Sequence, residues 1–253
     1  MTKMKKHLSV FGLFTRSSVY KVLLILIAMC AVQSLCFYME VQDAVAAYEA
    51  IGADMASLEK VFEKAAVSVY FRVALVLVSV AICLPGCAFK SNTGYTVGRL
   101  SVSERAAFFW QAAYNMLAYW LLLAVQLVTV FGLARYYVAA VPDEFVSNQT
   151  IMLAFYRNSF LHSLLPMEDI GLWIRNGLLV LSLGMACAEF PYRQRRHKFS
   201  ATAIALVSYT IVYFDQSIGK LVYAISSGVI ALVIIGEVIY MLTRKDEEAV
   251  QDD

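Results

Sequence analysis

The chain has 253 residues, of which 60% are hydrophobic and 16% charged, and its mean hydropathy is +0.66. A soluble domain carries about 25% charged residues, so this composition excludes an ordinary soluble fold. The formal net charge of +2 and the lack of a basic stripe interleaved with aromatic residues exclude nucleic acid as a partner.

The apolar runs predict an all-α, polytopic membrane protein with six transmembrane helices and both termini cytoplasmic. Backbone polar groups in lipid must be paired within their own segment, so each run is expected to be helical. The expected spans are 19–39, 69–89, 106–134, 170–190, 199–214 and 219–243, within one transmembrane domain over 1–245. The fourth run has thirteen uncharged residues and must extend past Arg175, whose side chain we expect to snorkel. Residues 246–253 are expected to form a disordered acidic tail.

The distribution of positive charge sets the orientation of the spans, because Lys and Arg are retained on the cytoplasmic side of short loops. With the amino terminus inside, fourteen of the 21 cations lie in the cytoplasm and seven outside. A further span over 145–165 would turn the cations at 193–198 outward, so this apolar stretch is expected to be an interfacial or re-entrant segment. Residues 40–68 and 135–169 are therefore expected outside.

The outer segment 40–68 predicts an amphipathic helix, because its apolar residues recur at spacings of three, four and seven. Gly52 is expected to interrupt it. Six acidic residues against Lys60 and Lys64 make the segment an acidic cap. The cap is either a solvated extension of the first two spans or a helix that binds an extracytoplasmic ligand.

The chain offers few groups for catalysis. It has no pair of His residues at helical metal-binding spacing, no Gly-x-Ser-x-Gly turn and no phosphate-binding loop for ATP. We expect no catalytic residue, no metal ligand and no cofactor bound by this chain, which is therefore not an enzyme.

The five cysteines all lie in apolar runs, and we expect buried free thiols, with Cys83 and Cys87 on a packing face beside Pro85. Small residues in the fourth and sixth spans predict close helix packing, and they are Gly177, Gly184, Ala188, Ala224, Gly228 and Ala231.

Glu237 is the one carboxylate well inside an apolar run. Acidic residues within membrane spans are costly and usually functional, so Glu237 is a candidate for a pathway residue. Snorkelling toward the end of the span, near Arg244 and Lys245, is the alternative.

The cytoplasmic connection 90–105, between the second and third spans, carries the most specific local signal. Ser101 followed by Glu104 forms a capping box, which predicts a helix that starts near Val102. Before it, Tyr95 to Leu100 is expected to form a short helical elbow along the membrane. Arg99 and Arg105 give this elbow its positive charge.

The layout resembles the type-2 ATP-binding-cassette exporter permeases, in which six spans have both ends inside and a short coupling helix precedes the third span. The residues that match the turn ending the connecting sequence in that family are Leu100, Ser101, Val102, Ser103, Glu104 and Arg105. The chain differs from the family in its short link between the fifth and sixth spans and its large outer segment between the third and fourth.

The resemblance implies a permease subunit of an ATP-driven exporter in the cell membrane. The elbow residues would dock in a groove of a cytoplasmic ATP-binding subunit that holds ATP and magnesium, and they are Tyr95, Arg99, Leu100, Ser101, Glu104 and Arg105. A second permease subunit, identical or homologous, would complete the pathway. The alternative function is a non-transport membrane sensor or assembly scaffold, whose acidic outer helix binds a ligand.

Overall fold

The computed structural model describes residues 3–52, 54–87, 104–147, 149–167, 169–195, 200–215 and 220–243, and helices are the only regular structure in these ranges. The longer helices are α1 (Lys3–Ile51), α3 (Val67–Cys83), α5 (Glu104–Ala140), α8 (Ile170–Arg195), α9 (Thr202–Tyr213) and α10 (Lys220–Thr243). The shorter ones are α2 (Leu58–Lys64), α6 (Thr150–Arg157) and α7 (Ser159–Leu164), with the 3-10 turns η1 (Leu84–Gly86) and η2 (Asp143–Phe145). The expected acidic tail 246–253 lies outside the described residues.

Several helices are suited to a membrane. α1, α5 and α8 each contain a stretch long and apolar enough to cross one, and α2 with α3, bent by 48° at their junction, make a fourth. α9 and the segment Ile225–Gly236 of α10 are shorter apolar helices. Between residues 22 and 39 the exposed side of α1 is mainly apolar, and Leu24 and Ile27 are each more than two-thirds exposed. The prediction of an all-helical membrane protein with several spans is confirmed at the level of three to four long apolar helices.

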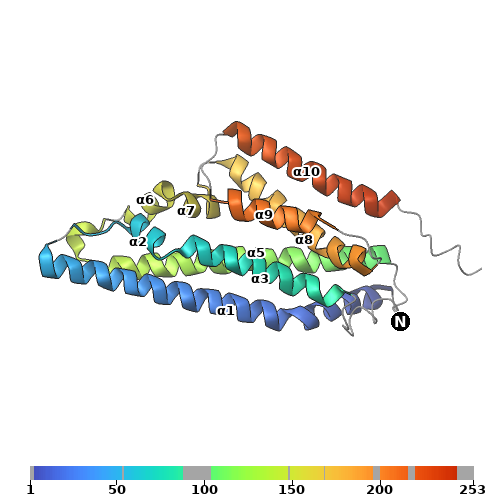
Figure 1. Ribbon diagram of the computed structural model, residues 1–253, viewed down its shortest axis with the longest axis horizontal. Helices are drawn as coiled ribbons and strands as arrows, with labels where there is room; N and C mark the ends of the chain where they lie inside the picture. Colours follow the sequence, from blue (N-terminus) through green and yellow to red (C-terminus); the bar gives the residue numbers. More distant parts are fainter. Residues whose placement is uncertain are drawn as a thin grey trace, which may run out of the picture.

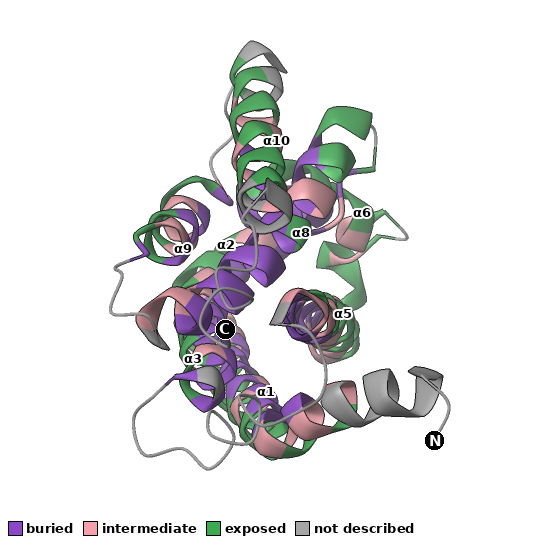
Figure 2. Cartoon of the chain, turned by 90° about the vertical axis from the view of Figure 1, so that its right-hand side faces the viewer, coloured by how far each residue is buried: buried purple, intermediate pink, exposed green. Residues whose placement is uncertain are grey.

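Successive long helices alternate in direction along the molecule (Figure 1). α1 and α5 begin at the end of the molecule where α3, α8 and α10 finish, and α9 runs back from that end. α5 packs against α1 and α8, and α8 also packs against α9 and α10. Buried residues line the facing sides of these helices, whereas α10 lies at the edge and is largely exposed (Figure 2).

α1 continues far beyond one membrane thickness. Its 49 residues extend about 74 Å, against a hydrocarbon core of about 30 Å. At the end of the molecule opposite the amino terminus, α1, α2, α5 and α6 form a lobe. There Tyr137 Oη donates to Ala56 O at 2.7 Å, and Gln42 Nε2 donates to Tyr136 Oη at 3.0 Å. Gly52, with φ 63°, follows the last residue of α1, so the expected interruption at this glycine is confirmed.

The apolar stretch 145–165 forms two short helices, α6 and α7, neither of which is long enough to cross a membrane. α6 is amphipathic: it buries Ala154 and Phe155 and leaves Met152 and Tyr156 60% exposed. Phe155 stacks on Phe131 of α5, with ring centroids 4.9 Å apart. The stretch therefore does not form a further span, and its exposed face is apolar.

The junction between α2 and α3 holds a strained residue. Ala66 has φ 51°, and a left-handed conformation costs an L-residue about 1–2 kcal/mol. Ala66→Gly is therefore expected to raise the free energy of unfolding by about 1 kcal/mol, since part of the gain is lost to the freer unfolded chain. Titration with a denaturing detergent, followed by helical circular dichroism, measures the change.

Ala65→Gly is the matched control, because Ala65 has an ordinary right-handed conformation. This variant is expected to lose about 1 kcal/mol. Equal losses in the two variants would show that Ala66 carries no strain.

Candidate functional site

Most residues of the predicted elbow lie outside the described residues, including Tyr95, Arg99, Leu100 and Ser101. α5 is described from Glu104, whose side chain is not, and Arg105 is half-buried in the first turn. The backbone of Glu237 lies in α10, but its side chain is outside the described set. The elbow and the pathway role of Glu237 therefore stay predictions.

A row of polar side chains follows one face of α5 into the bundle. Gln111, Asn115, Tyr119 and Gln126 are 3%, 0%, 1% and 0% exposed. Their spacings of four, four and seven place them on the same side of a helix. Hydropathy alone does not reveal this row, because apolar residues surround it, although the helical spacing of its polar residues is visible in the sequence.

Gln126, the last residue of this row, helps to hold three helices together. Gln33 Nε2 of α1 donates to Gln126 Oε1 of α5 at 3.0 Å and to Val67 O of α3 at 3.2 Å. Both glutamines are fully buried. Polar side chains that bond across apolar helices stabilise their association, so this amide pair fixes α1, α3 and α5 against one another.

Arg175 overturns one sequence-based expectation. Its side chain is 1% exposed and lies inside the bundle, so it does not snorkel. The guanidinium donates to Asn176 Oδ1 at 3.2 Å and to Phe214 O at 3.1 Å. Phe214 is the C-cap of α9, where backbone carbonyls have no helical partner. Arg175 therefore caps α9 and holds its end on α8.

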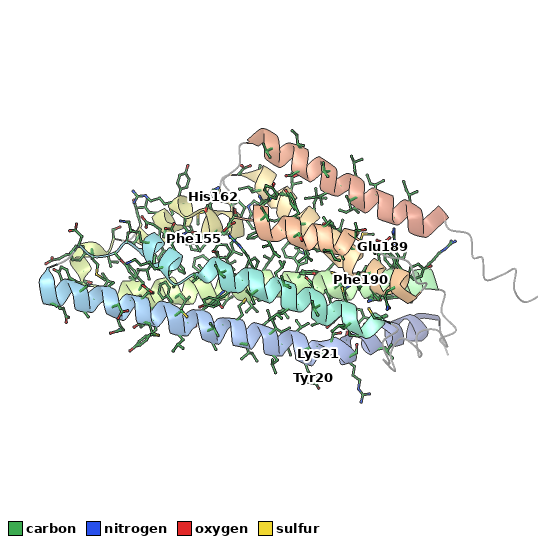
Figure 3. All side chains as sticks on the ribbon, viewed as in Figure 1. Tyr20, Lys21, Phe155, His162, Glu189 and Phe190 are labelled. Atoms are coloured by element: carbon green, nitrogen blue, oxygen red, sulfur yellow. The ribbon has the colours of Figure 1, made fainter. Side chains whose placement is uncertain are left out.

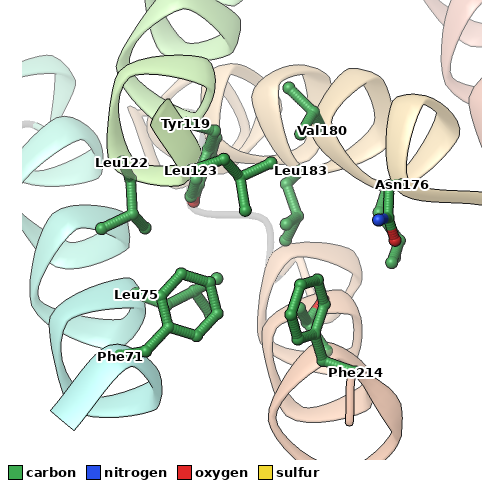
Figure 4. Close-up of a pocket in the computed structure, with 11 residues that line it drawn as sticks. Phe71, Leu75, Tyr119, Leu122, Leu123, Asn176, Val180, Leu183 and Phe214 are labelled. Atoms are coloured by element: carbon green, nitrogen blue, oxygen red, sulfur yellow. The ribbon is translucent and has the colours of Figure 1, made fainter. Parts of the chain in front are cut away.

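A small cavity of about 20 Å³ lies beside this cap, between Phe71, Tyr119 and Phe214 (Figure 4). Asn176 contributes the nearest side-chain amide and donates from Nδ2 to Ser163 O at 2.7 Å. The volume holds about one water molecule. This cavity is therefore too small for a substrate.

A network of hydroxyls and thiols joins α3, α5 and α8. Ser79 Oγ lies 2.7 Å from Tyr119 Oη, which lies 3.1 Å from Cys187 Sγ. Pro191, inside α8, has no N–H and cannot donate the helical hydrogen bond to the carbonyl of Cys187, four residues earlier. Cys83 Sγ donates to that carbonyl at 3.6 Å. The Cys83 thiol thus replaces the hydrogen bond that the proline removes.

The five cysteines are free, as expected, but only Cys87 and Cys187 are buried, and the other three are half-buried. Cys87 Sγ donates to Cys83 O at 3.4 Å, just after the η1 turn that contains Pro85. Both thiols of this pair therefore bond to backbone carbonyls, in agreement with a packing role.

Glu189 is a fully buried carboxylate near the end of α8. It forms an ion pair with Arg193, one turn later, and its Oε2 accepts from Ser200 Oγ and Thr202 Oγ1, each at 3.4 Å. Figure 3 places Glu189 and Phe190 toward the end of the molecule where α1 begins. Glu189 directly follows the thirteen uncharged residues of the fourth apolar run, so hydropathy alone does not identify it.

A groove of about 450 Å³ lies between α3, α8 and α9, and part of its lining belongs to the hydroxyl–thiol network. Its lining is apolar apart from Ser79, Cys83, Cys187 and Ser208. Pockets that bind small molecules have volumes of about 300–1,000 Å³ and mostly apolar walls. The groove is therefore the best candidate for a ligand-binding site in the described part of the chain.

Comparisons of the chain with protein-family models, curated proteins and solved structures find no match. Among the described residues, no group of three or more His, Cys, Asp or Glu side chains is placed to hold a metal ion. Function is therefore inferred from three features: the arrangement of the helices, the buried polar groups and the groove.

Proposed function

We propose that this chain is the permease subunit of an ATP-driven transporter of the type-2 ATP-binding-cassette kind, an exporter of the cell membrane. The observation that carries the proposal is the burial of polar and charged side chains in the apolar helices α5 and α8, including Asn115, Arg175 and Glu189. Such groups are costly in a bilayer, and in membrane proteins they mark pathways and moving parts.

The proposed topology has six spans, formed by α1, α2 with α3, α5, α8, α9 and α10, with both termini in the cytoplasm. The alternating directions of the helices (Figure 1) and the ratio of fourteen cations to seven support it. α9 has 12 residues, about 18 Å, so the fifth span needs flanking residues to cross.

The proposed mechanism couples an ATPase to α5. ATP and magnesium belong to a separate cytoplasmic ATP-binding subunit, and a second permease subunit, identical or homologous, completes the pathway. The elbow 90–105 docks on the ATPase and leads into α5 at Arg105. Since α5 is one continuous helix, movement of its first turn is transmitted to Asn115 and Tyr119. Glu237 on α10 is proposed to line the pathway.

Arg99→Glu combined with Arg105→Glu is expected to reduce co-purification of a Walker-loop ATPase by about tenfold or more. Two reversed charges convert attraction toward an acidic groove into repulsion. The measurement is the amount of ATPase bound to the tagged chain after extraction from native membranes. Arg244→Glu with Lys245→Glu is the matched control, since it reverses two cations elsewhere on the cytoplasmic side. Outside labelling of a cysteine introduced at Ser147 verifies the topology of each variant.

Full retention of the ATPase by the elbow variant, with normal transport, would contradict the docking role. If the unchanged chain recovers no ATPase, the alternative of a sensor or scaffold takes precedence. That alternative draws on the lobe formed by α1, α2, α5 and α6, where the carboxylate-bearing residues Asp43 and Glu49 of α1 are exposed. Binding of an extracytoplasmic ligand to the lobe would then be measured directly.

A further inference from the structure

We propose that the groove between α3, α8 and α9 binds one acyl chain of an anionic phospholipid, with the lipid phosphate next to Arg193 at the end of α8. The proposal concerns lipid binding alone and holds whether or not the chain works with an ATPase.

The lining of the groove suits a hydrocarbon chain better than a polar ligand. The walls are formed by apolar side chains such as Val80, Ile204 and Val207. The polar groups of the floor already have partners, since Ser79 Oγ bonds to Tyr119 Oη and to Leu75 O. Cys83 Sγ likewise bonds to a backbone carbonyl. A polar ligand would lose its hydrogen bonds with water and gain few here, whereas a hydrocarbon chain loses none.

The groove is open to an acyl chain from the side of the molecule. Val80, Leu84 and Ile204 lie at the rim of the groove and are 48%, 49% and 53% exposed, so the rim is itself apolar. The wall formed by α9 runs from Ala203 to Ile211, about 12 Å along the helix axis. This short wall flanks helices that are suited to a membrane. The groove therefore opens sideways toward lipid, and an acyl chain can enter it without crossing water.

A positive charge lies close to one end of the groove. Ala203 lines the groove, and the preceding residue, Thr202, donates from Oγ1 to Glu189 Oε2 at 3.4 Å, so the Glu189–Arg193 ion pair lies close to this end. The side chain of Arg193 is 28% exposed.

Glu189 is 0% exposed, so the part of this ion pair that a head group can reach is the Arg193 guanidinium. Basic residues next to the end of a membrane helix attract anionic lipids. Charge complementarity therefore selects an anionic head group over a zwitterionic one.

The test uses the full chain in nanodiscs with a phosphatidylglycerol probe that carries a diazirine on one acyl chain. A phosphatidylcholine probe with the same chain is the lipid control. After irradiation, mass spectrometry of peptides is expected to find the phosphatidylglycerol adducts on Val80, Ile204 and Val207. Labelling there is expected to exceed that of Ile27, a lipid-exposed residue of α1, severalfold. Arg193→Gln combined with Glu189→Gln, which leaves no unpaired charge, should reduce the preference for phosphatidylglycerol by about fivefold, the effect of removing one cation.

Ile204→Trp is expected to fill the groove and abolish its labelling. Ile235→Trp on α10 is the matched control, because Ile204 and Ile235 are 53% and 52% exposed. Equal labelling of the groove and of Ile27 would show bulk lipid only and overturn the proposal. Equal labelling by the two probes would overturn the anionic preference, and unchanged labelling in Ile204→Trp would overturn the assignment to the groove.

Discussion

Gly184→Ala is expected to lower the free energy of unfolding by about 3 kcal/mol, at the upper end of the usual cost of overpacking. A Cβ on Gly184 would lie 2.5 Å from Met116 Cγ, 3.0 Å from Met116 N and 3.2 Å from Met116 Cα. The methionine side chain can rotate away, but its backbone cannot move without shifting α5. Asn115 Nδ2 donates to Gly184 O at 3.2 Å, so the shift would also strain this bond.

Gly177→Ala is the matched control, since Gly177 lies two turns earlier on α8 and has no atom within 4 Å of an added Cβ. Alanine is a better helix former than glycine, so this variant is expected to gain up to about 1 kcal/mol. Detergent titration followed by helical circular dichroism compares the two. A loss no larger in Gly184→Ala than in Gly177→Ala would show that α5 and α8 are not in close contact at this crossing.

The same crossing supports the groove. Tyr119 lies one turn after Asn115 on α5, and its hydroxyl lies 3.1 Å from Cys187 Sγ, three residues after Gly184. Displacement of α5 would therefore separate Tyr119 from Cys187 and open the floor of the groove. We expect Gly184→Ala to weaken lipid labelling at Ile204 as well as stability.

The helices themselves were readable from the sequence, because a backbone in an apolar segment has to satisfy its own hydrogen bonds. Three to four of the expected spans correspond to helices long and apolar enough to cross a membrane, and Gly52 ends α1 as predicted. Of the glycines expected to allow close packing, Gly184 does so, whereas Gly177 and Gly228 have open space around them. Composition identifies candidate contacts, but only the crossing of two helices decides which of them forms.

The orientation of Arg175 could not be read locally. An arginine near the end of a short apolar run can snorkel or turn inward, and here the deciding acceptor, Phe214 O, lies 39 residues later. The bond between Cys83 and the Cys187 carbonyl joins residues 104 positions apart. The sequence shows Pro191, which removes a helical hydrogen bond to the Cys187 carbonyl. Which side chain donates to that carbonyl instead depends on how α3 packs on α8.

Arg193→Met is expected to lower the free energy of unfolding by about 3–5 kcal/mol, the usual cost of leaving one buried charge without its partner. Glu189 is 0% exposed, and Arg193 is its ion-pair partner. The hydroxyls of Ser200 and Thr202 are both 3.4 Å from Glu189 Oε2, which is too long for them to compensate a full charge. Glu189→Gln, which keeps the shape and the acceptor, is expected to cost less, about 1–2 kcal/mol.

The double variant Glu189→Gln with Arg193→Met is therefore expected to be more stable than Arg193→Met alone, because no unpaired charge remains in it. The same detergent titration of all four proteins gives the coupling energy of the pair, expected at about 2 kcal/mol or more. Strictly additive losses would show that Glu189 and Arg193 act independently. Coupling would instead show that Glu189 and Arg193 stabilise each other at the end of α8, close to the end of the groove where the lipid phosphate is proposed to lie.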